Sequence, residues 1–530
     1  MVTLIRSVTV TALWPPRRGV HVVRQQLRRF SNKFELYENA PIPANKRRFV
    51  PDSGFYPKGF SVASINAGIN STKRTRPDLT MVKSDVPSCG AAVFTRNKFP
   101  AASVTASRKH LSATKGNGLG GVIANAGCAN LFTGQAGLDD AAAMMNAANE
   151  LLVSSSPSSA AVAVGETPPS VIVMHTGKGG ERLPMDKVLQ SIRHLPERMG
   201  NSHQHWLGAA EAICTTDTFP KLASRQFELP SNPGIVYSMA GITKGAGMIH
   251  PNMATTLGII CTDAPILASD LQALLADATD KTYNCISIEG DTSTNDMVAI
   301  LANGAAGGKT IGGHDAAERS TEAAAAAARD DFRAFKQGLD ELMTEMAKLV
   351  VRDAEGATKF ITIRVRGAWS PARARRVAAA VARSVLVKTG VTAGDLKNWG
   401  GTVLAAVGSS LLDVPGPRDH ELGDGPDPEA LRVDESRAII PERVSLSVLP
   451  VGRLADTERP VVVLRRGMPV DVDASAAMAL LEHEDVEVLI DMDDVDSDDD
   501  KYGMTSHKQK YEAVYWTSNL TQDFVAVNGG

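Results

Sequence analysis

The chain has 530 residues, a formal net charge of -3 and a pI near 6.4. At roughly 100–200 residues per domain, this length predicts two or three domains, or two subunits cut from one precursor. The balanced charge excludes the basic face that nucleic-acid-binding proteins need. No apolar run reaches the ~18–20 residues that cross a bilayer, so we expect neither nucleic acid nor a membrane as a partner.

The cysteines indicate a reducing compartment. There are five of them, an odd number, and no two have C-x-x-C spacing. This pattern argues against a disulfide framework and against a zinc site built from thiolates. No other cluster of metal-ligating residues is visible in the sequence, so we expect neither a metal nor a cofactor.

The N-terminus has the composition of a mitochondrial presequence. Residues 1–34 contain no Asp or Glu but seven Arg and Lys residues. Such a segment forms a basic amphipathic helix that membrane potential draws inward. We therefore predict a presequence over residues 1–31, with processing near 28–31 and the mitochondrial matrix as destination. A disordered basic tail and a plastid transit peptide are the alternatives.

Between residues 55 and 310, short β-like runs alternate with helical patterns, which predicts an α/β class. The predicted strands are 120–125, 170–174, 235–239 and 257–261, and the predicted helices are 138–152 and 186–195.

After residue 330 the pattern predicts a helix over 332–350, a strand over 359–365 and a helix over 371–385. In the strand, Ile361, Ile363 and Val365 alternate with polar residues, so they form its apolar face. Three compositionally biased stretches indicate solvated loops or added surface helices. These stretches cover residues 311–330, 412–436 and 491–501.

The segment 243–258 carries the most chemical information. A Gly-rich bend is followed by a Pro-Asn turn, Ala254, Thr255 and a predicted strand. Backbone strain before Thr255 would favour attack of its hydroxyl on the carbonyl of Ala254. Hydrolysis of the resulting ester would free an α-amino group with a pKa of ~7.7–8.0, which can serve as a general base. From spacing alone, a plain connection between two strands is the better interpretation.

Family motifs change that balance. Residues 244–255 match K-G-x-G-M-x-x-P-N-M-A-T throughout, and this segment resembles the autoproteolysis site of the ornithine acetyltransferase family, the bifunctional glutamate N-acetyltransferases/amino-acid acetyltransferases. Further segments resemble the family in the same order along the chain. They are residues 57–60, 93–97, 124–130, 214–221, 290–296, 353–360 and 398–400.

The resemblance implies an αββα sandwich of the N-terminal-nucleophile type. It also implies cleavage into an α chain (32–254) and a β chain (255–530) that assemble as a heterotetramer. Residues 255–330 would complete the catalytic sandwich, and 331–530 would form a C-terminal α/β part. The implied reaction moves acetyl from N-acetylornithine to glutamate, with acetyl-CoA as a candidate second donor.

The family's functional residues carry over by motif. Thr255 corresponds to the nucleophile, and Thr176 with Gly177 corresponds to the oxyanion hole, where a hydroxyl and a backbone N–H can point at one oxygen. Together with Thr255, the implied substrate-binding residues are Thr215, Lys244, Glu355 and Asn528. Each has a plainer interpretation as a turn or surface residue.

This sequence departs from the family pattern at four places. After the Thr176–Gly177 pair it has residues 178–180, Lys-Gly-Gly, where the family usually has an apolar residue and a single Gly. Ala354 replaces a Gly, Gly401 replaces an Arg, and the chain ends at Gly530 without the family's terminal substrate-binding threonine. Two alternatives therefore stay open: a related self-cleaving aminopeptidase or amidase that delivers acyl groups to water, and a non-catalytic paralogue.

Overall fold

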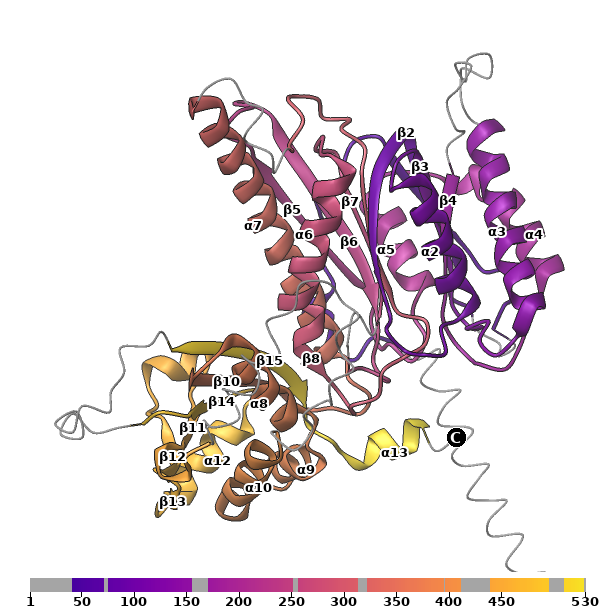
Figure 1. Cartoon of the computed structure of the whole chain (residues 1–530). Helices are drawn as coiled ribbons and strands as arrows, with labels where there is room; N and C mark the ends of the chain where they lie inside the picture. The colour runs from indigo at the N-terminus through magenta and orange to yellow at the C-terminus, as the bar shows by residue number, and fades with distance from the viewer. Residues whose placement is uncertain are drawn as a thin grey trace, which may run out of the picture.

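A computed structural model describes residues 41–70, 75–154, 170–250, 256–312, 322–394, 396–410, 439–494 and 510–528. The predicted presequence, the predicted cleavage site with Thr255, and the stretch 412–436 lie outside the described residues. Figure 1 shows two parts, a larger one that contains β2 to β7 and a smaller one that contains β10 to β15.

An eight-stranded sheet forms the larger part, in the order β4-β3-β2-β9-β7-β6-β5, with β1 paired to β2. The strands are β1 (Phe60–Ile65), β2 (Leu79–Phe94), β3 (Leu119–Asn125), β4 (Ser170–His175), β5 (Lys221–Glu228), β6 (Val236–Lys244), β7 (Leu257–Thr262) and β9 (Met297–Ala302).

Strand β2 joins the two halves of this sheet. Its first residues pair with β1 and β3, whereas Cys89 to Phe94 pair with β9. One apolar cluster contains residues of both halves, including Val122, Met174, Ile242 and Ile259, all 0% exposed. The halves therefore pack face to face, as the two inner layers of a sandwich.

Helices cover the outer faces (Figure 1). Helices α2 (Ala102–Thr114), α3 (Gly134–Ser154) and α4 (Met185–Arg193) pack over β1 to β4. Helices α6 (Ala268–Lys281) and α7 (Glu322–Arg352) pack over the half that contains β5, β6, β7 and β9. Helix α5 (His203–Ala212) contributes Trp206 to the core between the halves. The predicted αββα sandwich is confirmed.

A seven-stranded sheet forms the smaller part, in the order β13-β12-β11-β14-β10-β15-β8. Its strands are β8 (Ile286–Ser287), β10 (Phe360–Ala368), β11 (Ser445–Leu449), β12 (Val461–Arg465), β13 (Met468–Pro469), β14 (Asp485–Asp491) and β15 (Tyr511–Ser518). Its helices are α8 (Pro371–Arg383), α9 (Val385–Ala393), α10 (Leu396–Ser409), α12 (Ala474–Glu482) and α13 (Gln522–Asn528).

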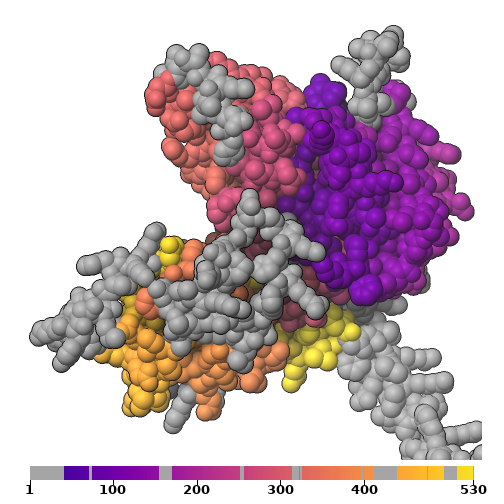
Figure 2. Space-filling model, viewed as in Figure 1, coloured from indigo at the N-terminus to yellow at the C-terminus, as the bar shows by residue number. Residues whose placement is uncertain are grey.

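The predicted elements are present, with shifted ends. In β10, Ile361, Ile363 and Val365 are 0% exposed, as their alternation predicts. Helix α7 begins at Glu322, inside the stretch 311–330, and packs on β5, β6 and α6. The helical layer over β5 and β6 thus extends to Arg352. Figure 2 shows the two parts as separate lobes, with the yellow C-terminal residues at their boundary.

Candidate active site

The bend between β6 and β7 leads into the predicted cleavage site. Lys244, the last residue of β6, pairs with Leu257, the first of β7. Gly245 has φ +146° and Met248 has φ +55°. A positive φ is costly for a residue with a side chain, so Met248 places strain in the backbone just before residues 251–255.

This bend is held by residues that follow the predicted cleavage site in sequence. The carbonyl of Ala246 accepts a hydrogen bond from Glu355 N at 2.9 Å, and that of Ile249 accepts one from Ile288 N at 2.6 Å. The hydroxyl of Thr292 donates to the carbonyl of His250 at 2.7 Å. Hydrogen bonds to backbone carbonyls therefore join the predicted α chain to the predicted β chain up to residue 250.

Two charged side chains, the partly buried Glu289 and the buried Lys388, support the same bend. Glu289 accepts a hydrogen bond from Ile249 N, and Lys388, which is 0% exposed, donates to Ile288 O and to Thr517 Oγ1. Burial raises the pKa of Glu289 to about 7 and lowers the pKa of Lys388 to about 7. Both groups therefore titrate near the pH at which an α-amine acts as a base.

The predicted oxyanion turn follows β4. Thr176 N donates to Asn125 O at 3.1 Å, which uses up that N–H. Gly177 has φ +128°, and a Cβ there would lie 2.3 Å from the carbonyl carbon of Gly127, so only glycine fits. Within the described residues, the Thr176 hydroxyl and the Gly177 N–H have no partner. The turn therefore presents two free donors on neighbouring residues, as the predicted oxyanion hole requires.

Asn295 and its neighbours link this turn to the β6–β7 bend. Asn295 Nδ2 donates to Ala129 O at 2.7 Å and to His175 O at 2.9 Å. Two residues later, Met297 N donates to Thr256 O at 3.0 Å. The structure thus brings Thr176 and Gly177 to the same end of the sandwich as Lys244 and the start of β7.

A fully buried charge network lies behind the predicted substrate-binding residues. Lys221, at the start of β5, is 0% exposed, and its Nζ donates to Asp217 at 2.6 Å and to Asp353 at 2.5 Å. Asp217 also accepts hydrogen bonds from Gly245 N at 2.8 Å and from Thr215 N at 2.9 Å. We call Asp217, Lys221 and Asp353 the buried triad.

The triad holds three chain segments that each carry a predicted substrate-binding residue. Asp217 binds the loop of Thr215 and the bend after Lys244, and Asp353 begins the loop of Glu355. Burial alone would raise the pKa of Asp217, but Lys221 and Lys244 outweigh it and hold that pKa below its ordinary value. Burial and the Asp217 charge keep the pKa of Asp353 raised despite Lys221.

Glu355 and Asn528 are in direct contact. Asn528, on α13, donates from Nδ2 to Glu355 Oε2 at 2.5 Å. The Glu355 carboxylate packs against Gly247, where a Cβ would come within 2.5 Å of it. Glu355 lies just before β10, and Asn528 lies at the end of α13. The two residues were predicted from separate motifs, and they meet beside the β6–β7 bend.

The buried His175 and the partly buried His250 predict acid sensitivity. Burial lowers the pKa of His175 to about 3, and burial with the nearby Arg383 lowers the pKa of His250 to about 4. In the unfolded chain each imidazole titrates near ~6.5. As the pH falls from 6.5 toward 4, these imidazoles bind protons in the unfolded chain but not in the folded protein, so the free energy of unfolding decreases.

We expect His250→Asn to remove about 1–2 kcal/mol of this loss between pH 7 and pH 5. Asparagine can keep the hydrogen bond that His250 Nδ1 makes with Ser287 Oγ at 3.2 Å. Unfolding midpoints of both proteins at pH 5, 7 and 8 test this. The difference in unfolding midpoint between variant and parent should be constant from pH 7 to 8. At pH 5 the midpoint of the variant should rise relative to that of the parent. An unchanged difference at pH 5 would contradict the expectation.

Sequence reasoning named the motifs of the triad and of Asn295 but gave these residues no role. Their charge could have indicated a role, because Asp217, Lys221 and Asp353 are charged residues within segments whose other residues predict burial. Asp296 is a further such residue, fully buried beside Lys244, and burial raises its pKa well above its ordinary value.

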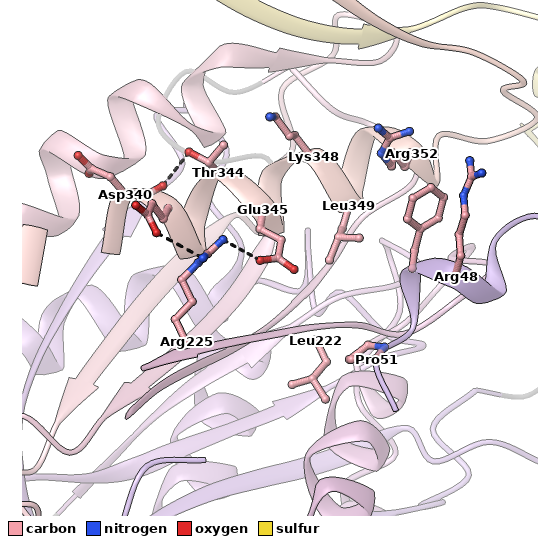
Figure 3. Close-up of a pocket in the computed structure, with 12 residues that line it drawn as sticks. Arg48, Pro51, Leu222, Arg225, Asp340, Thr344, Glu345, Lys348, Leu349 and Arg352 are labelled. Carbon is pink, nitrogen blue, oxygen red and sulfur yellow. Dashed lines mark hydrogen bonds and ion pairs between the residues drawn. The ribbon is translucent and has the colours of Figure 1, made fainter. Parts of the chain in front are cut away.

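A pocket of about 610 Å³ lies elsewhere, between α7, β5 and the segment 48–51. Figure 3 shows Lys348 and Arg352 on α7 above Leu222 of β5, with Arg225 between acidic side chains. None of the predicted site residues lines it. In the part of the chain that the structure describes, no group of three His, Cys, Asp or Glu could hold a metal, and no helix is long and apolar enough to span a membrane.

Comparison with known proteins gives consistent matches. A model of the ArgJ family matches residues 61–530, a range that includes every predicted site residue. The chain is 49% identical over 499 residues to the "Arginine biosynthesis bifunctional protein ArgJ 2, mitochondrial" of Sclerotinia sclerotiorum, covering 94% of each chain. It is 43% identical over 511 residues to the mitochondrial ArgJ protein of Neurospora crassa, covering 96% of each.

Among solved structures, the chain is similar to an ornithine acetyltransferase from Mycobacterium tuberculosis in complex with ornithine. The identity is 34%, the match covers 37% of this chain and 94% of that one, and the TM-score is 0.30.

Proposed function

This chain belongs to the ArgJ family, and from that membership we propose that it cuts itself between Ala254 and Thr255 and transfers acetyl through Thr255. It is a mitochondrial acetyltransferase of arginine biosynthesis that moves acetyl from N-acetylornithine to glutamate. The observation that carries the proposal is the geometry on both sides of residues 251–255: a strained bend before them and the oxyanion turn linked to Thr256 after them.

Cleavage would proceed in two balanced steps. The Thr255 hydroxyl attacks the Ala254 carbonyl, the C–N bond breaks, and the amide becomes an ester with a free α-amine on Thr255. Water then hydrolyses the ester, leaving a carboxylate on Ala254 and a free hydroxyl on Thr255. Relief of the strain at Met248 favours the first step, because strained backbone raises the energy of the uncut chain.

Acetyl transfer would use the new α-amine as base. The amine takes the hydroxyl proton while Oγ1 of Thr255 attacks the acetyl carbonyl of N-acetylornithine, and ornithine leaves with that proton. Glutamate's amine then attacks the acetyl ester, giving N-acetylglutamate and restoring Thr255. In both steps the Thr176 hydroxyl and the Gly177 N–H would donate to the oxyanion.

Charge supports the assignment of substrate contacts. Lys244 offers a cation for an α-carboxylate, whereas Glu355, held by Asn528, offers a carboxylate for an ammonium group. Thr215 is fixed by Asp217 at the same end of the sandwich. Ornithine and glutamate both carry an α-amino-acid core, so one such site can receive them in turn.

After cleavage the two chains should stay associated. The bonds from residues 246–250 to Glu355, Ile288 and Thr292 cross the proposed cut, and β6 and β7 remain neighbours in one sheet. A heterotetramer made of two such pairs is part of the proposal.

An assay with N-acetylornithine separates this enzyme from a self-cleaving amidase. We expect ornithine release to require glutamate and N-acetylglutamate to form in equal amount, with ping-pong kinetics. Acetate released at the same rate without glutamate would assign the chain to the hydrolases. A persistent single band near full length, with no turnover, would favour the non-catalytic paralogue.

The relatives are named bifunctional, so acetyl-CoA is a second candidate donor. Incubating acetyl-CoA and glutamate without N-acetylornithine tests it. N-acetylglutamate should appear together with free CoA, and its absence would leave N-acetylornithine as the donor.

A further inference from the structure

Helix α2 packs in register along the back of β4, behind the oxyanion turn. His110 Nε2 lies 2.6 Å from Ser170 Oγ at one end. One turn nearer the helix start, Ser107 Oγ donates to Val173 O at 2.8 Å and accepts from Val173 N at 2.9 Å. Helix and strand therefore run in opposite directions, and Ser103, a further turn back, comes to the His175 end of β4.

Strand β3 places Asn125 beside His175. The two are register partners in the parallel pair β3–β4. Both alternate with residues of the core between the sheets, Ala124 and Met174, so both face the layer that contains α2 and α3. Asn125 Nδ2 donates to Ala126 O and to Cys128 O, at 3.2 and 3.0 Å, but its Oδ1 has no partner.

The polar atoms at this place are unsatisfied. In the described part of the chain, Ser103 Oγ, Asn125 Oδ1 and both ring nitrogens of His175 are buried side-chain atoms that lack a hydrogen-bond partner. All three side chains are 0% exposed. Buried polar groups in native proteins are almost always satisfied, by protein or by ordered water, so this concentration requires a partner.

We propose that Ser103, Asn125 and His175 bind ordered water behind the Thr176–Gly177 turn, and that His175 is thereby a positioning residue for the oxyanion donors. One water can donate to Asn125 Oδ1 and to the unprotonated ring nitrogen while accepting from the Ser103 hydroxyl. The inference rests on the proposed function, because it takes the turn to be the oxyanion hole.

His175 is suited to this role by position and by protonation state. Its carbonyl accepts from Asn295, and the next residue is Thr176, so a shift of the ring moves the turn directly. Burial keeps the imidazole neutral, so it offers one donor and one acceptor across the working pH range.

Kinetics of two variants test the role. His175→Phe keeps an aromatic ring without polar atoms, and His175→Gln keeps one donor and one acceptor. We expect His175→Phe to lower kcat roughly tenfold to a hundredfold with KM within about twofold, because the displaced donors act on the transition state. His175→Gln should retain kcat within a few-fold. Met174→Leu, on the opposite face of β4, is the matched control and should keep both constants.

Equal losses in His175→Phe and His175→Gln, or full kcat in His175→Phe, would overturn the positioning role. Should His175→Phe fail to fold, a high-resolution crystal structure of the unaltered protein decides. It should show a water within hydrogen-bond distance of Ser103 Oγ, Asn125 Oδ1 and the ring, and direct pairing of these side chains without water would refute the proposal. Thr176→Val separates a failure of the proposed oxyanion hole from a failure of the proposed water site. If this variant keeps kcat unchanged, the oxyanion assignment fails, whatever the crystal structure shows of the water.

Discussion

Replacing Thr255 by alanine will abolish both chain cleavage and acetyl transfer. Alanine has no hydroxyl to attack the Ala254 carbonyl, so the precursor stays whole and no α-amine is freed. We expect a single chain on a denaturing gel and a loss of at least ~10⁴-fold in kcat, the order seen when a nucleophile is removed.

Thr256→Val is the matched control, since it removes the adjacent hydroxyl. Thr256 Oγ1 bonds to the carbonyl of Lys244 and lies 3.2 Å from Thr243 Oγ1, which is a structural role. That variant should still be cut. N-terminal sequencing of the smaller chain checks the bond itself. A chain that starts at any residue other than Thr255, or a Thr255→Ala protein that is still cut, would refute the nucleophile assignment.

The hydrophobic pattern of the sequence predicted the helices and strands, because the buried face of a helix or strand is set by residues that are close in sequence. The alternation of Ile361, Ile363 and Val365 gave the buried face of β10 directly. The apolar runs at 120–125 and 170–174 gave two strands buried on both faces. The start of α7 was missed because Ala-rich, charged sequence suits a solvated loop as well as a helix, and packing against β5 and β6 decides between them.

Family motifs predicted which residues serve the site but not how they are held. Lys221 and Asp353 are 132 residues apart, and Asn295 and His175 are 120 residues apart, so no local pattern connects them. Their pairing depends on how β4, β5 and β9 are ordered in the sheet. The contact of Asn528 with Glu355 likewise depends on the smaller sheet, which returns α13 to the end of the sandwich.

Lys221→Met should be the most destabilising single change at the site. It removes the cation between Asp217 and Asp353, which are 2% exposed each, and leaves two like charges in a dry interior. Breaking a buried ion pair in this way costs about 3–5 kcal/mol. We expect the lower stability to appear as a depressed unfolding midpoint, and substrate KM to rise because the loops of Thr215 and Glu355 lose their common anchor.

Lys281→Met supplies the matched control, because Lys281 also pairs with an aspartate four residues earlier, Asp277, but on the surface, at 47% and 43% exposure. That change should cost less than about 1 kcal/mol. In Lys221→Met, one of the two carboxyls must take up a proton, so its folded-state pKa rises above its unfolded value, and stability is regained as pH falls. The gap in unfolding midpoint between Lys221→Met and the parent should therefore narrow from pH 7 to pH 5. A gap that stays constant with pH, or one no larger than that of Lys281→Met, would mean that the triad's charge is not what holds the three substrate loops together.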